Sequence, residues 1–179
     1  MAGRRATDGE VAAWQQHGWV LLDGLIDPAE IDVLADELGA LFPTPAEYHA
    51  DPAATRAGWL GGRPDSTEQF LWPETGPGFR AEQHRWHHEF PLPGSPRLNR
   101  LFIHPAVVDF ARRALGDDDI RIYQMGVNAK YTGEANYEQP MHTDRNHSWL
   151  PARPEAPWWH VQAFLYLSDV TEGLSLIHI

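Results

Sequence analysis

The stretch YEQPMHTDRNHSW, residues 137–149, contains a histidine and an aspartate separated by one residue. Alternate residues of a β-strand point to the same side, so on a strand His142 and Asp144 would present a nitrogen and a carboxylate oxygen to one cation. A third ligand from another strand would complete one face of an octahedral metal. The alternative is two ordinary polar residues, because a bare H-x-D is expected about once by chance in such a chain.

The residue types restrict the choice of metal. The chain has ten His and no Cys, which excludes disulfides, zinc–thiolate sites and thiol nucleophiles. Histidine and carboxylate ligands favour Fe(II), Mn(II) or Zn(II) over Cu(I) or an iron–sulfur cluster. Two histidines and one carboxylate with open positions are typical of non-haem iron(II) oxygenases, in which a 2-oxo acid and then dioxygen take those positions.

Composition limits the remaining functions. The 179 residues suffice for one domain with a core, and 42% of them are hydrophobic. The net charge of −11, without a basic block, makes nucleic acid a poor partner. The apolar runs are too short to span a membrane and the N-terminus lacks the apolar core of a signal peptide, so a cytoplasmic protein is expected.

Three helices are predicted from capping residues and periodicity. Residues 8–17 form the first, with Gly18 as its C-cap. Residues 27–42 form the second, with Asp27 as N-cap, Pro28 in the first turn, Glu30 completing a capping box, and a buried face of Ile31, Leu34, Ala35, Leu38 and Leu41. Residues 105–115 form the third, which ends at Gly116.

Strands are predicted at residues 18–26, 118–133 and 157–170. Alternation from Ile120 to Tyr131 places Gln124, Asn128 and Lys130 on one face. Helices followed by strands favour an α+β or mainly β fold with a sandwich or barrel core. Residues 43–97, rich in Pro, Gly and aromatics, are either a lid over a site, with an apolar wall of Trp59, Trp72, Trp86 and Phe90, or a packed irregular layer.

Four stretches resemble the phytanoyl-CoA dioxygenase family. They are VAAWQQHGWVLLDGLIDPAEIDVLADEL, HPAVVDFARRALGDDDIRIYQ, PMHTD and VQAFLYLSDVTEG, in the family's order and spacing. The resemblance implies one domain over residues 1–173, a double-stranded β-helix (a cupin-like jelly roll) with N-terminal flanking helices, incomplete at its C-terminal end.

The resemblance also implies a chemistry and a set of residues. The family uses Fe(II), dioxygen and 2-oxoglutarate to hydroxylate a small organic molecule, releasing succinate and CO2. His142 and Asp144 match the first two iron ligands. The strand with Gln124, Asn128 and Lys130 matches the one that contacts the cosubstrate, although an exposed polar edge explains these three residues equally well. Trp149 is a further candidate to pack beside the cosubstrate.

The sequence departs from the family pattern after DVTEG. No later histidine followed by an arginine matches the third iron ligand and the residue that pairs with 2-oxoglutarate, and His178 comes too soon after Asp144. Residues 174–179, LSLIHI, are interpreted as a non-native tail on a truncated domain. We therefore expect this chain to bind metal weakly, to be poorly soluble and to be inactive.

Two other functions stay open on the sequence alone. A jelly roll with a decayed site would bind a small molecule without consuming 2-oxoglutarate. A hydrolase would use His142, Asp144 and a further ligand around Zn(II) without dioxygen. For an oxygenase, the acidic chain favours a neutral or cationic substrate over a coenzyme A ester, whose phosphates need Arg and Lys.

Overall fold

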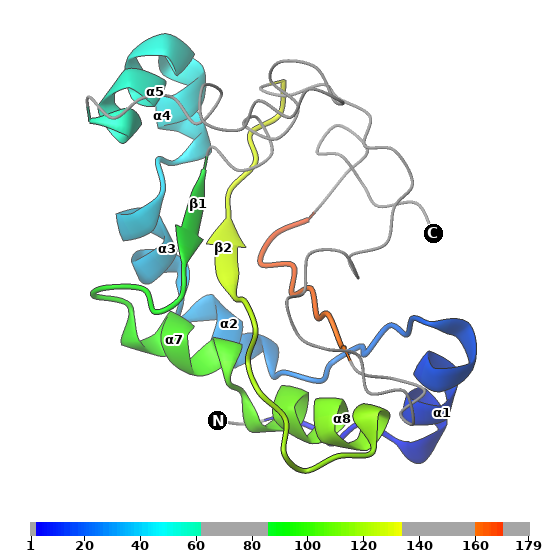
Figure 1. The fold of residues 1–179 in the computed structure, drawn as a ribbon. Helices are drawn as coiled ribbons and strands as arrows, with labels where there is room; N and C mark the ends of the chain where they lie inside the picture. The colour runs from blue at the N-terminus through cyan, green and yellow to red at the C-terminus, as the bar shows by residue number, and fades with distance from the viewer. Residues whose placement is uncertain (1–2, 62–85, 134–159, 170–179) are drawn as a thin grey trace, which may run out of the picture. The chain divides into compact units, whose positions relative to one another are not determined.

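A computed structural model describes residues 3–61, 86–133 and 160–169 (Figure 1). The described residues fall into two compact units. The first contains residues 3–37, 91–125 and 160–167, and the second contains residues 38–61, 86–90, 126–133 and 168–169. Helix α3 (Ala35–Leu41) begins in the first unit and ends in the second.

The first unit is built on two helices that the sequence predicts correctly. Helix α1 spans Asp8–His17, and its C-cap Gly18 has the left-handed φ of 80°. Helix α8 spans Pro105–Leu115 and ends at Gly116, with a φ of 66°. A glycine adopts this conformation without the clash that a Cβ atom causes, so both helices stop where the sequence places the glycine.

The core of the first unit lies where α1 packs against α8. Trp14 of α1 meets Phe110 of α8 edge to face, with ring centroids 6.4 Å apart. Ala6, Val11, Leu25 and Ala114 are buried around this pair. Apolar side chains of the two helices therefore meet in the core of this unit. Helix α7 (Pro96–Phe102) also belongs to this unit.

The single helix predicted over residues 27–42 is wrong in its middle. The structure has two helices, α2 (Pro28–Asp32) and α3, separated by a turn at Val33 and Leu34. The N–H of Leu34 donates to the carbonyl of Ile31, three residues back, and the turn leaves Leu34 only 2% exposed. Leu34 is therefore buried as predicted, although the backbone around it forms a turn and not a helix.

The start and the inner face of that segment also differ in detail. Asp27 is the N-cap, as predicted, but its carboxylate accepts from the N–H of Ala29, and the predicted capping box with Glu30 is not formed. Ala35 is exposed, whereas Leu34 and Leu38 face inward. The sequence identified Asp27 as the N-cap of the helix, but it did not identify Ala29 as the residue that donates to it.

Residues 18–26 do not form the predicted strand. A turn closes between Leu22 and Leu25, with Gly24 in the left-handed region at φ 60°, and only Ile26 pairs with another residue, Gly3, in an isolated bridge. The backbone groups of an extended segment need a partner along their whole length to form a strand. Apolar composition alone therefore did not predict pairing here.

The second unit combines two short helices and a small sheet. Where the sequence predicted no long regular element, the structure has α4 (Pro45–Ala50) and α5 (Pro52–Leu60). Strand β1 (His87–Glu89) pairs antiparallel with β2 (Gly126–Asn128), in the register His87–Asn128, His88–Val127 and Glu89–Gly126. Both helices begin with a proline after a capping Thr44 or Asp51, a helix start that the sequence contained.

The predicted strands are much shorter or missing among the described residues. Only residues 126–128 of the predicted strand 118–133 pair, and residues 160–169 form no strand. Alternation predicts which side chains face inward, but pairing depends on distant residues that it does not identify. The double-stranded β-helix stays a prediction, since β1 and β2 form the described sheet.

The described helices are short or polar by the standard of a membrane-spanning segment. Not one of them combines the length and the hydropathy that crossing a bilayer requires.

Candidate functional site

One face of the β1–β2 sheet is polar. Residues directly opposite each other in an antiparallel pair project to the same side, so His87 and Asn128 share a face with Glu89 and Gly126. Lys130 follows Asn128 by two residues, is exposed, and continues the alternation, while Val127 and Tyr131 are buried. Asn128 and Lys130 therefore both face outward, as the alternation predicts, while the residues between and after them are more buried.

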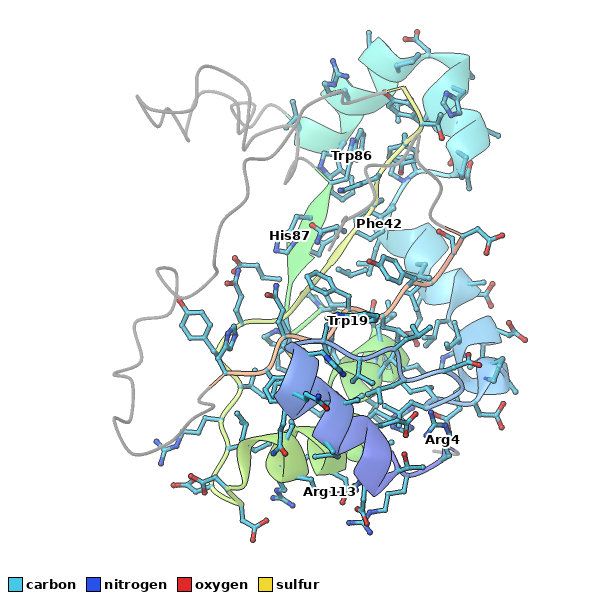
Figure 2. The ribbon with its side chains drawn as sticks, turned by 90° about the vertical axis from the view of Figure 1, so that its right-hand side faces the viewer. Arg4, Trp19, Phe42, Trp86, His87 and Arg113 are labelled. Carbon is cyan, nitrogen blue, oxygen red and sulfur yellow. The ribbon has the colours of Figure 1, made fainter. Side chains whose placement is uncertain are left out.

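His87 lies across this polar face (Figure 2). Its Nδ1 is 2.6 Å from Oδ1 of Asn128, on the facing strand. A Cβ atom built on Gly126 would lie 2.3 Å from Cε1 of His87, so any side chain at position 126 would displace the imidazole. The glycine thus leaves the space in which His87 reaches Asn128.

The charge on the polar face comes from Lys130 and Glu89. Desolvation by burial lowers the pKa of the Lys130 ammonium, although the residue as a whole is exposed. Partial desolvation strengthens the interaction of this ammonium with an anion that reaches it. A face with an amide, an imidazole and an ammonium can therefore hold a carboxylate.

The opposite face of the sheet carries aromatic residues. Trp86, directly before β1, is 1% exposed and contacts the rings of Tyr48, Tyr131 and Trp59. Tyr131 stacks on Tyr48 with centroids 4.3 Å apart, and its hydroxyl donates to the carbonyl of Pro43. Trp86 is therefore a core residue, which agrees with the packed layer considered for residues 43–97 and not with a substrate-facing wall at this position.

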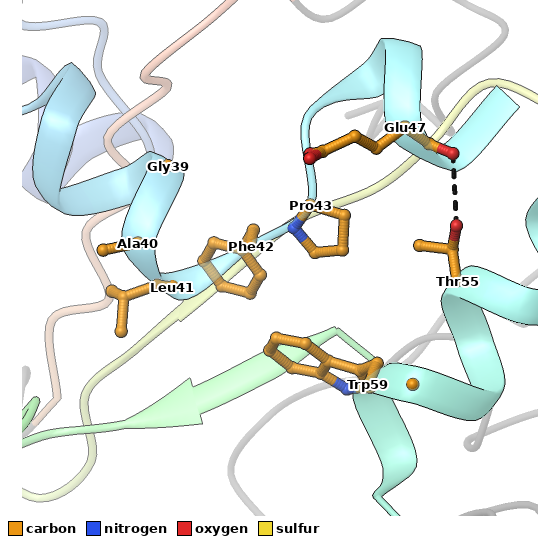
Figure 3. A pocket seen from close by; sticks show the side chains of 9 residues that line it. Gly39, Ala40, Leu41, Phe42, Pro43, Glu47, Thr55 and Trp59 are labelled. Atoms are coloured by element: carbon orange, nitrogen blue, oxygen red, sulfur yellow. Dashed lines mark hydrogen bonds between the residues drawn. The ribbon is translucent and has the colours of Figure 1, made fainter. Parts of the chain in front are cut away.

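Trp59 takes part in an open hollow of about 450 Å³ (Figure 3). Its indole stacks on the ring of Phe42, with centroids 5.6 Å apart. The hydroxyl of Thr55 donates to the carbonyl of Glu47 at the rim. The hollow offers aromatic faces and one carboxylate, a combination that suits a neutral or cationic organic group.

Several predicted site residues lie outside the described residues. His142, Asp144 and Trp149 are among them, and so is Trp72 of the predicted apolar wall. Gln124 is described and exposed, and it belongs to the first unit. Within the described ranges, no cluster of three His, Asp or Glu residues is placed to hold a metal ion. The roles of His142 and Asp144 as ligands, and of Gln124 and Trp149 as cosubstrate contacts, stay predictions.

Comparison with known protein families decides what kind of chain this is. The model of the phytanoyl-CoA dioxygenase family matches residues 14–173. The chain belongs to this family. Members of the family are, in general, Fe(II)- and 2-oxoglutarate-dependent oxygenases with a jelly-roll fold. Searches of the curated proteins and of the solved structures find no match.

The phytanoyl-CoA dioxygenase match covers the residues on which the sequence interpretation rests. His142 and Asp144 lie inside the matched range, as do both strands of the polar face. His87 was not identified from the sequence as a site residue. The available signal was the run WHHEF in an otherwise irregular segment, together with a glycine inside the alternating strand at position 126.

Proposed function

We propose that the residues of this chain serve Fe(II)- and 2-oxoglutarate-dependent hydroxylation of a small organic molecule, a reaction for which the 179 residues alone are expected not to suffice. The match of residues 14–173 to the phytanoyl-CoA dioxygenase family, with the H-x-D of His142 and Asp144 inside it, carries the proposal. Dioxygen and a small-molecule substrate are the expected reactants.

The polar face of the second unit fits the cosubstrate. 2-Oxoglutarate is a dicarboxylate, and it needs cationic and amide donors around its carboxylates. Lys130 and Asn128 supply an ammonium and an amide on one outward side of the chain. Asn128 and Lys130 support a 2-oxoglutarate site because their side chains can bind an anion. They also lie in the segment that the family resemblance assigns to the cosubstrate.

The candidate residues would have two roles, metal binding and cosubstrate binding. His142 would contribute a neutral imidazole nitrogen and Asp144 a carboxylate oxygen, two ligands of a set of three. Fe(II) bound by these residues would supply the dioxygen-activating chemistry that is coupled to decarboxylation of 2-oxoglutarate. Lys130 would pair with a carboxylate of the cosubstrate, and Asn128 would donate a hydrogen bond to it, fixing its orientation before the substrate reacts.

We further propose a neutral or cationic substrate. The net charge of −11 disfavours a polyanion such as a coenzyme A ester. The hollow beside Trp59 and Phe42, with Glu47 at its edge, contains the groups that receive an aromatic, aliphatic or ammonium moiety.

The metal ligands are tested by binding of Mn(II), a redox-inert substitute for Fe(II). Electron paramagnetic resonance of free Mn(II) measures how much the 179-residue chain binds. We expect weak, saturable binding, because the H-x-D supplies two ligands, and its loss in His142→Ala and in Asp144→Ala.

His147→Ala is the matched control, since it removes an imidazole from the same stretch without touching the H-x-D. It should bind Mn(II) as the parent chain does. Equal Mn(II) binding by the parent chain, His142→Ala and Asp144→Ala would contradict the proposed ligands.

A further inference from the structure

The contact between His87 and Asn128 couples the tautomer of the imidazole to the orientation of the amide. Nδ1 of His87 lies 2.6 Å from Oδ1 of Asn128, an atom that has no hydrogen and can only accept. This orientation of the amide therefore requires a hydrogen on Nδ1, whereas the flipped amide would donate from Nδ2 to a deprotonated Nδ1. The amide orientation in the structure thus pairs with the Nδ1–H form of His87.

The Nδ1–H form of His87 goes with one orientation of the Asn128 amide. With Oδ1 directed at His87, Nδ2 and its two hydrogens are directed away from the imidazole. Lys130 projects from the same side of the chain, two residues further along. An anion on this face would then meet N–H donors of Asn128 and Lys130 and would not meet the amide oxygen of Asn128.

Two neighbours of His87 restrict where the anion can lie. Gly126 permits the imidazole to cross to the facing strand, because a Cβ atom there would lie 2.3 Å from the ring. Glu89, opposite Gly126 on the same face, places a negative charge at that end of the sheet. Repulsion from Glu89 and attraction to Lys130 both favour a carboxylate at the Lys130 end.

We propose that His87 is a positioning residue that holds the Asn128 amide with its donors toward a carboxylate ligand. This inference rests on the proposed function, in which that ligand is 2-oxoglutarate. His87 acts through Asn128 and need not touch the ligand. In its Nδ1–H form, His87 selects the amide orientation whose Nδ2 donates to the ligand. In the Nε2–H form, His87 would accept from Nδ2 and leave Oδ1 to repel the anion.

The tautomer can be measured directly on the metal-free, ¹⁵N-labelled 179-residue chain. Long-range ¹H–¹⁵N correlation spectra at a pH above the ordinary histidine pKa distinguish Nδ1–H from Nε2–H, and His87→Ala assigns the signal. We expect Nδ1–H in the parent chain and a shift toward Nε2–H in Asn128→Ala. An Nε2–H signal for His87 in the parent chain would overturn the inference.

The effect on the ligand can be measured by titrating 2-oxoglutarate into the labelled chain with Zn(II), a diamagnetic substitute for Fe(II). Shifts of the Asn128 side-chain amide give the dissociation constant even when binding is weak. His87→Ala should raise it about fivefold or more, the value of one hydrogen bond. His87→Gln should recover part of the loss, because its amide also donates to Oδ1.

His49→Ala is the control, since it removes an exposed imidazole of the same unit from α4. It should leave both the tautomer and the dissociation constant unchanged. Binding of 2-oxoglutarate that is as tight in His87→Ala as in the parent chain overturns the role of His87 and leaves the proposed function standing. Absence of any 2-oxoglutarate binding by the parent chain overturns the proposed function, and with it the role of His87.

Discussion

At the scale of single residues, alternation along the chain predicted which side chains face outward, because this depends on neighbouring residues. It missed contacts between residues that are far apart in the sequence. The outward placement of Asn128 and Lys130 follows from the two-residue period of an extended backbone. His87 is 41 residues from Asn128, and only the strand register brings the two together. His142 and Asp144 lie outside the described residues, so for them the family match is the available support.

Glu37 shows how one buried carboxylate can hold a helix terminus. It is 9% exposed, and its oxygens accept from Nε of Arg97 at 2.8 Å and from the backbone N–H groups of Arg97 and Leu98 at the start of α7. Desolvation by burial raises the pKa of Glu37, but the hydrogen bonds from Arg97 and Leu98 outweigh it, so the pKa lies below its ordinary value.

Glu37→Gln should lower the free energy of unfolding by about 1–3 kcal/mol, because it leaves donors of α7 and the guanidinium poorly paired. A pKa below that of the unfolded chain means that ionised Glu37 stabilises the fold above its ordinary pKa of 4.5, and that this stability is lost as the pH falls through the lower folded value. Urea denaturation at several pH values measures both effects.

Asp36→Asn is the control for Glu37, because it removes an exposed carboxylate from the adjacent position of α3. It should change the free energy of unfolding by less than about 0.5 kcal/mol. An effect of Glu37→Gln as small as that of Asp36→Asn would show that Glu37 does not hold α7.

At the scale of elements, helix ends followed from the sequence more reliably than helix continuity or strand pairing. The glycines at 18 and 116 ended α1 and α8 where expected, because the cap is a local conformation. The helix predicted over residues 27–42 begins where expected, but it is interrupted by a turn at Leu34, a buried residue. Strand pairing in residues 18–26 and 160–169 failed because alternation carries no information about a partner.

The start of α1 depends on a capping box that the structure shows completely. Thr7 Oγ1 accepts from the N–H of Glu10, and the Glu10 carboxylate accepts from the N–H of Thr7 and from both terminal nitrogens of Arg4. The Arg4 hydrogen bond, followed by the Thr7 backbone, lowers the pKa of Glu10 to about 2. The helix therefore begins in a network of ionised and backbone groups.

Thr7→Ala should lower the free energy of unfolding by about 1 kcal/mol, and Thr7→Ser should restore most of it, since serine caps equally well. Glu10 contributes stability above its ordinary pKa of 4.5 and loses it as the pH falls toward 2, so acid unfolding should be less steep in Glu10→Gln. Denaturation followed by circular dichroism measures both. A Thr7→Ser variant as unstable as Thr7→Ala would contradict the capping role.

At the scale of the whole chain, a high negative charge coexists with exposed apolar side chains. Among the described residues, Leu21 is 78% exposed, Phe164 60% and Tyr166 56%. Val161, in the same segment as the last two, packs partly buried against the core around Trp14 and Phe110. We therefore expect the segment anchored at Val161, with Phe164 and Tyr166 exposed, to promote self-association, an expectation in the same direction as the poor solubility that the sequence predicts.

The double variant Phe164→Ser, Tyr166→Ser should therefore bind less of an apolar-surface dye and sediment with less self-association than the parent chain. Repulsion at a net charge of −11 opposes association, so added salt should increase association of the parent chain by screening that repulsion. Val161→Ala is the contrasting variant: it should lower the stability of the first unit without reducing association. If salt dissolved the aggregates, or if the double variant aggregated like the parent chain, apolar contact through Phe164 and Tyr166 would not be the cause.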